Sequence, residues 1–133
     1  MGYARIAAML QRRDTIILDG GTGTDLQSRG APMDGDTWCA DANLSHPDIV
    51  RSVHRGYVDS GADIITANTF ATSPLLFSHL GRIDELDQID AAAVALPKGS
   101  VSGIDVCVAG PKTTTRPVLW GGYGNAQVII REA

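Results

Sequence analysis

The chain has 133 residues, of which 44% are hydrophobic and 20% are charged, a composition typical of one globular domain rather than of a disordered chain. Its net charge of −4 argues against nucleic acid or an anionic membrane surface as a partner. No apolar segment reaches the roughly 18 residues that a membrane span requires. The two cysteines, Cys39 and Cys107, form no C-x-x-C pair, so we expect a cytoplasmic protein with free, buried thiols.

The first predicted elements are a short amphipathic helix over residues 3–12 and a strand over residues 15–18. The helix places Ile6, Met9 and Leu10 at helical spacing, and we expect it to flank the base of a larger fold. The strand is continuously apolar, which is typical of a parallel strand covered on both faces. A helical turn over 24–30 and a loop over 31–44, rich in Pro, Gly, Asp and Asn, are predicted next.

Asp19, Gly20 and Gly21 follow the first predicted strand directly and are the most informative feature of the chain. A carboxylate at the carboxyl end of a parallel strand lies where barrel enzymes keep their chemistry, and glycines allow close backbone approach. An Asp-Gly pair is also a common turn, in which the carboxylate only caps the next helix. Gly21 and Gly23 begin a G-x-G-x-x-G pattern, but Leu26 takes the third glycine position, which argues against a nucleotide site.

The clearest predicted unit is a helix from Ser45 to about residue 60, followed by a strand over 63–67. Ser45 and Asp48 resemble a capping box, and Gly61 ends the helix. The strand stops at two polar residues, Asn68 and Thr69. Strand, helix and strand within about 50 residues predict a right-handed parallel βαβ unit.

Further helices are predicted over 74–80 and 84–96, the second one ended by Pro97, and a third strand over 104–109. The order indicates an α/β fold with a parallel sheet. Residues 1–110 form the predicted domain. Residues 111–133 break the pattern, with a possible short strand only at 128–130, and we assign no role to this segment.

The segment LDGGTGTDLQSRG at 18–30, Trp38, ANLSHPDIVRSVHRGYVDSGADIITANTF at 42–70 and the Ser73-Pro74 pair together resemble the N-terminal part of the homocysteine S-methyltransferase family. The resemblance covers roughly residues 14–96. It implies the N-terminal portion of a (β/α)₈ TIM barrel, with about three βα units, in which homocysteine lies at the carboxyl ends of the strands. It also implies methyl transfer to the homocysteine sulfur, giving methionine, with a zinc ion that holds the sulfur as a thiolate.

The resemblance assigns substrate-binding positions to five residues. Asp19 matches the residue that helps to hold the amino group of homocysteine, and Gly20 and Gly21 match the glycines that let the backbone close around the amino acid. Asn68 and Thr69 match the end of the second strand, which lines the same cup. For Asn68 a structural role, as a strand-end cap that hydrogen-bonds its own loop, stays open. His46 and His54 are interpreted as helix-start and packing residues rather than as ligands.

The family's three zinc-binding cysteines have no match in this chain, because Cys39 and Cys107 lie at other positions. A barrel of this kind needs about 250 residues, so we expect a fragment of the enzyme, without turnover on its own. The alternative hypothesis is a half-barrel module that pairs its open sheet edges with another chain, either a second copy or a complementing C-terminal half.

Overall fold

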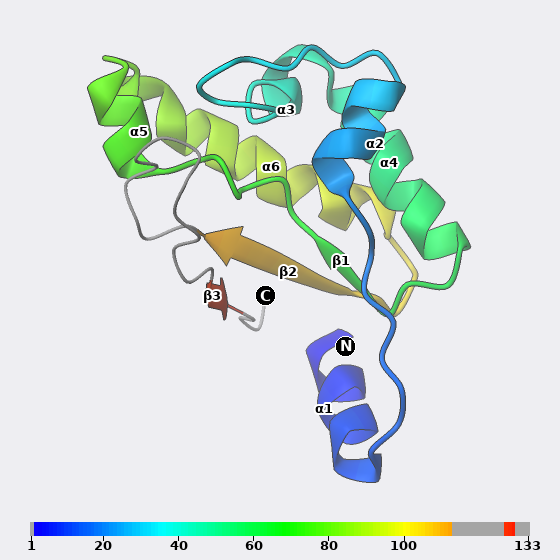
Figure 1. Cartoon of the computed structure of the whole chain (residues 1–133). Helices are drawn as coiled ribbons and strands as arrows, with labels where there is room; N and C mark the ends of the chain where they lie inside the picture. Colours follow the sequence, from blue (N-terminus) through cyan, green and yellow to red (C-terminus); the bar gives the residue numbers. More distant parts are fainter. Residues whose placement is uncertain (1, 113–126, 130–133) are drawn as a thin grey trace.

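The computed structural model describes residues 2–112 and 127–129, which form an α/β arrangement around a small sheet (Figure 1). The strands are β1 (Ile64–Thr66), β2 (Cys107–Lys112) and β3 (Gln127–Ile129). The helices are α1 (Gly2–Arg12), α2 (Thr22–Ser28), α3 (Ala42–Ser45), α4 (Pro47–Asp59), α5 (Pro74–His79) and α6 (Leu86–Ser100), with a 3-10 turn η1 over Ile83–Glu85.

The sheet has the order β1-β2-β3, with β1 and β2 parallel and β3 antiparallel to β2. Ile64 pairs with Cys107, so α6 is the crossover helix of a parallel βαβ unit. The predicted strand over 15–18 is reduced to one parallel bridge between Leu18 and Ile64. The predicted three parallel strands are therefore wrong: two strands are parallel, and the first predicted strand is an extended segment alongside β1.

The two faces of the sheet are covered by different helices. Ile64, Cys107 and Ala109 pack against Ile6 of α1 on one face. Ile65, on the other face, packs with Val101 and with Tyr57 of α4, and Figure 1 shows α4 and α6 together on the side of the sheet away from α1. Strand β1 is therefore covered on both faces. Cover on both faces is predicted for the first segment, and there the prediction is wrong, since Ile17 and Leu18 are 53% and 63% exposed.

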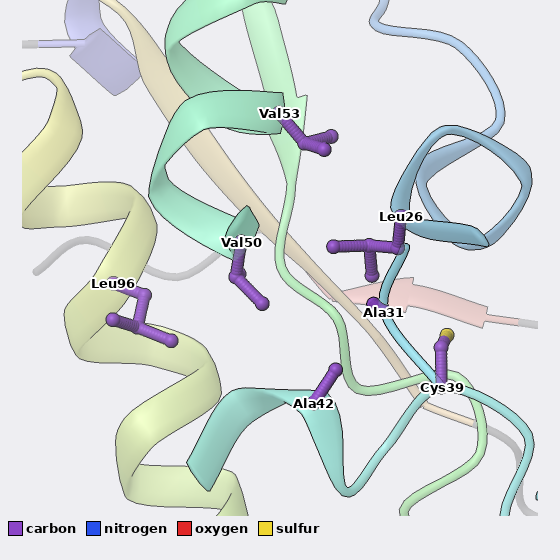
Figure 2. Close-up of a cluster of buried hydrophobic side chains, with 7 residues drawn as sticks. All are labelled: Leu26, Ala31, Cys39, Ala42, Val50, Val53 and Leu96. Atoms are coloured by element: carbon purple, nitrogen blue, oxygen red, sulfur yellow. The ribbon is translucent and has the colours of Figure 1, made fainter. Parts of the chain in front are cut away.

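A second part of the core joins α2, α3, α4 and α6 away from the sheet (Figure 2). Val50 and Val53 are three residues apart on α4, so they lie on the same helix face, and both are fully buried. They pack with the other members of the cluster, which are Leu26, Ala31, Cys39, Ala42 and Leu96. This cluster holds the segment over residues 31–42 against α2, α4 and α6.

Two local predictions differ from the structure. Helix α6 continues through Pro97 to Ser100; the proline removes one hydrogen bond close to the helix end, while Leu96 and Pro97 themselves are buried there. Ser45 does not cap α4. It ends α3, and its hydroxyl donates to the Asp41 carbonyl oxygen at 2.9 Å, because a separate helical turn precedes Pro47.

The carboxyl-terminal part begins later and extends further than the sequence predicts. Strand β2 starts at Cys107 rather than at residue 104 and runs through Gly110 and Pro111. The predicted strand at 128–130 is found as β3, Gln127–Ile129; residues 113–126 and 130–133 lie outside the described residues. Within the described ranges, no helix is both long and apolar enough to cross a membrane.

Candidate functional site

Asp19 lies at the carboxyl end of the segment that pairs with β1. Its backbone N–H donates to the Ile64 carbonyl oxygen at 2.9 Å, which fixes the residue to the strand. Its carboxylate accepts two hydrogen bonds from Thr66, the last residue of β1: from the backbone N–H to Oδ2 and from the hydroxyl to Oδ1, both at 2.6 Å. A carboxylate has about four acceptor positions, so these two bonds orient Asp19 and leave further positions for a ligand.

Gly20 and Gly21 carry the chain from Asp19 to α2. A Cβ on Gly20 would lie 3.0 Å from the ring and hydroxyl of Tyr57, so the backbone packs directly on that ring. Burial, with the charges of Asp25 and Asp19, raises the pKa of the Tyr57 hydroxyl, which therefore stays protonated. Gly21 lines an open hollow on the protein surface together with Thr24, Asp25, Ser28 and Tyr57.

Asn68 is buried and makes a hydrogen-bond network with residues 25 to 29 positions earlier in the chain. Its Nδ2 donates to the Cys39 carbonyl oxygen at 2.8 Å and to Asn43 Oδ1 at 3.1 Å. Its Oδ1 accepts from the Cys39 thiol at 3.0 Å, and its backbone carbonyl oxygen accepts from Asn43 Nδ2 at 3.0 Å. The alternative prediction, that Asn68 caps the strand by bonding to its own loop, is wrong about the partner. The Asn68 amide binds Cys39 and Asn43, which lie far earlier in the chain.

Thr69 ties the loop after β1 to the next strand. Its hydroxyl donates to the Pro111 carbonyl oxygen of β2, and its own carbonyl oxygen accepts from the Thr72 hydroxyl at 3.0 Å. The Ala67 N–H donates to the Ala109 carbonyl oxygen at 2.7 Å just below this contact. Thr69 therefore lies at the same carboxyl edge of the sheet as Asp19.

The structure thus brings Asp19, Asn68 and Thr69 to one edge of the sheet, and the chain carries Gly20 and Gly21 away from that edge toward α4. Whether these residues contact a substrate stays a prediction. Sequence reasoning missed Thr66 and Asn43 as their partners. Thr66 could have been found as the polar end of the apolar Ile64-Ile65 run, whereas nothing in the local pattern singles out Asn43.

The donors in the part of the chain that the structure describes do not fit a metal site. Among the described residues, no group of three or more His, Cys, Asp or Glu side chains could hold a metal ion. Cys39 packs in the cluster around α4 and Cys107 in the cluster around α1. Burial raises the pKa of both thiols, so each is held in the protonated form, which is a poor metal ligand.

The two histidines of the α3–α4 region have separate surroundings. His46 lies between α3 and α4, with its Nδ1 2.8 Å from the Ser45 hydroxyl oxygen. His54 is fully buried on α4, and neither of its ring nitrogens has a hydrogen-bond partner among the described residues. The interpretation of His54 as a packing residue agrees with this burial.

Comparison with known sequences gives one consistent family. A model described as homocysteine S-methyltransferase matches residues 16–130. Homocysteine S-methyltransferase of Escherichia coli K12 is 30% identical over 80 residues, which cover 60% of this chain and 26% of that protein. Homocysteine S-methyltransferase 3 of maize is 43% identical over 58 residues, covering 43% of this chain and 17% of the relative. The chain thus spans about a quarter or less of the length of these curated relatives.

Comparison with solved structures agrees with the sequence comparison. The homocysteine methyltransferase MmuM from Escherichia coli, in its metallated form, superposes with a TM-score of 0.68 and 25% sequence identity. The match covers 77% of this chain and 39% of that structure. Because the family model covers most of the chain and the fold agrees with it, this protein belongs to the homocysteine S-methyltransferase family.

Proposed function

We propose that this chain supplies the part of a homocysteine S-methyltransferase that holds the amino-acid end of the thiol substrate. One observation carries the proposal: Asp19 stands at the carboxyl edge of the sheet with both carboxylate oxygens oriented by Thr66. An oriented carboxylate with acceptor positions left over suits an ammonium group, which offers three donors. The free cysteines, Cys39 and Cys107, suit the reducing cytoplasm, where we place the protein.

The residues around Asp19 would complete the cup for homocysteine. Gly21 presents backbone without a side chain beyond the carboxylate, so a ligand can approach the main chain there, whereas Gly20 packs on the Tyr57 ring and lets the turn lie close to α4. Asn68 and Thr69 form the wall at the end of β1, where both are buried. Asp19 binds the amino group, and the other residues shape the cup around it. The reaction itself forms a bond from the homocysteine sulfur to a methyl carbon, and the donor leaves with the electrons of the bond that it loses.

The zinc ion of the family enters no step that we assign to these residues. Its chemistry is to stabilise the substrate thiolate. The described residues offer no cluster of ligands for it. Recognition of the amino group by Asp19 does not require the metal, since the carboxylate attracts the ammonium whether or not the sulfur is ionised.

The test is calorimetric titration of the purified chain with L-homocysteine under reducing conditions. Asp19→Asn should weaken binding by about ten- to a hundredfold, because a hydrogen bond to a charged group contributes about 1.5–3 kcal/mol. Asp48→Asn is the matched control. Asp48 is an exposed carboxylate at the start of α4 that pairs with Arg51 at 2.6 Å, and its loss should leave the affinity unchanged. Equal affinities for the wild-type chain and Asp19→Asn would refute the assignment.

A second candidate function is assembly through the exposed edge of the sheet. Ile17 and Leu18 are exposed apolar side chains, and the Ile17 carbonyl oxygen and the Asp19 N–H point toward β1. In the described part of the chain, no strand pairs with the opposite edge of this segment. Unpaired apolar edges associate readily, so a second chain or a complementing C-terminal half would cover this edge.

Sedimentation of wild type and Leu18→Lys over a concentration series tests assembly through this edge. Monomers at every concentration would contradict self-association, and unchanged sedimentation of wild type with an added C-terminal half would contradict complementation.

A further inference from the structure

The most extensively hydrogen-bonded side chain near the proposed cup is Asn68, and its partners form a clasp between two segments. We define the clasp as Asn68, Asn43 and Cys39. Four hydrogen bonds of 2.8–3.1 Å join them, and all three residues are at most 6% exposed. The donors and acceptors of the Asn68 amide are thus used within the protein, which leaves little capacity for a direct bond to substrate.

The clasp holds the segment before α3 in an unusual conformation. Trp38 has a φ of +52°, in the left-handed region that bulky residues rarely adopt. Such a conformation persists only where the surroundings over-determine it. On one side of Trp38 the Asp34 N–H donates to the Trp38 carbonyl oxygen at 2.8 Å, and on the other side Cys39 is held by Asn68 through both its carbonyl and its thiol.

Trp38 and Cys39 in turn pack on the start of α2. This helix begins directly after Gly20 and Gly21, which we call the glycine turn. A Cβ on Gly23 would lie 2.9 Å from the Trp38 ring and 3.3 Å from the Cys39 sulfur, so ring and sulfur both touch the Gly23 backbone. Gly23 is two residues from Gly21 and four from Asp19. The clasp therefore connects the end of β1 to the glycine turn that follows Asp19, the residue proposed to bind the amino group.

We propose that Asn68 is a positioning residue, which acts through Asn43 and Cys39 to hold Trp38 and Cys39 against Gly23 and thereby fixes the glycine turn after Asp19. The inference rests on the proposed function for its purpose, while the clasp itself can be tested without a ligand. In this role Asn68 does not contact the substrate directly. It holds the neighbouring turn in its binding conformation, which lowers the free-energy cost of ordering that turn on binding.

The ligand-free test measures how fast iodoacetamide alkylates each cysteine in the folded chain, by peptide mass spectrometry. Asn68→Ala and Asn43→Ala should each speed the alkylation of Cys39 at least about tenfold, whereas Cys107 should keep its rate because it lies in the cluster around α1. The double variant should be no faster than the faster single variant, since both act through one clasp. Thr72→Ala is the matched control: it removes a buried hydroxyl whose bond stays in the loop after β1, so Cys39 should keep its wild-type rate.

Two outcomes of the alkylation test would overturn the clasp. Equal acceleration of Cys39 and Cys107 in Asn68→Ala and Asn43→Ala would mean that these bonds stabilise the whole fold equally, which contradicts a clasp that holds one segment. An unchanged Cys39 rate in both variants would mean that the segment is held by other contacts.

The ligand arm separates the clasp from the proposed function. If the wild-type chain binds L-homocysteine, Asn68→Ala and Asn43→Ala should each weaken the affinity about tenfold, although Asn43 lies outside the predicted cup. Unchanged affinity in both would overturn positioning. If wild type shows no binding, the proposed function fails for this chain, and the Cys39 rates still decide whether the clasp exists.

Discussion

His54 provides a sharp test of the packing between α4 and its neighbours. The side chain is fully buried and neither ring nitrogen has a partner among the described residues. Burial lowers the pKa of His54 from 6.5 to about 4, because the imidazolium would lose its hydration without gaining a compensating contact. The folded state therefore holds His54 neutral, while the unfolded chain takes up a proton near the ordinary pKa.

The sign of the pH effect follows from that difference. Above pH 6.5 His54 is neutral in both states and does not make stability depend on pH. As the pH falls from 6.5 toward 4, only the unfolded state binds the proton, so the free energy of unfolding decreases. One pKa unit corresponds to about 1.4 kcal/mol, so the full window is worth about 3 kcal/mol, and the step from about pH 7 to about pH 5 costs about 2 kcal/mol.

Replacing His54 with leucine removes the titrating group and puts an apolar side chain of similar size in its place. The assay is urea unfolding followed by circular dichroism at pH 7 and pH 5 for wild type and His54→Leu. Other groups titrate equally in both proteins, so the difference in pH dependence isolates His54, and wild type should lose about 2 kcal/mol more than the variant. At pH 7 the variant should be at least as stable, because two unpartnered nitrogens leave the core. The same loss in both proteins would refute the reasoning.

Three further perturbations test the packing of other elements. Gly23→Ala places a methyl group against the Trp38 ring and should lower the free energy of unfolding by about 1–3 kcal/mol, whereas Gly35→Ala, with open space around it, should change it little in the same urea titration. Phe77→Ala empties a fully buried site and should cost about 3–5 kcal/mol; its control, Leu75→Ala, is 54% exposed and should lower the thermal midpoint far less. Asp63→Asn breaks the partly buried ion pair with Arg5 that ties α1 to the sheet, so trypsin should cut after Arg12 and Arg13 faster than in wild type. Asp59→Asn breaks only an exposed pair with Arg55 on α4 and should leave the cleavage rate after Arg12 and Arg13 unchanged, so equal cleavage of both variants would contradict an anchoring role for Asp63.

The sequence determined the class of fold because its elements carry strong local patterns. The apolar stripe of Ile49, Val50 and Val53 predicts α4, and Gly61, with a φ of +96°, ends it as expected. The helix at residues 3–12 is found. A parallel βαβ unit is also found, but it runs from β1 to β2, because the first strand of the predicted unit is reduced to one parallel bridge. Polar residues after apolar runs located Asp19 and Asn68 at the carboxyl edge, since parallel strands end on the same side of a sheet.

Only the tertiary structure decided what the polar residues touch and which strands are covered. The apolar run at 16–18 predicts a buried strand, yet burial depends on neighbours outside the run, and Leu18 is 63% exposed. The partners of Asn68 lie 25 to 29 residues earlier, and a periodic pattern holds no information about such contacts. Periodicity fixes which face of an element is apolar, whereas hydrogen-bond partners depend on how distant segments pack, and that is why the sequence located Asn68 at the edge but only the fold revealed the clasp.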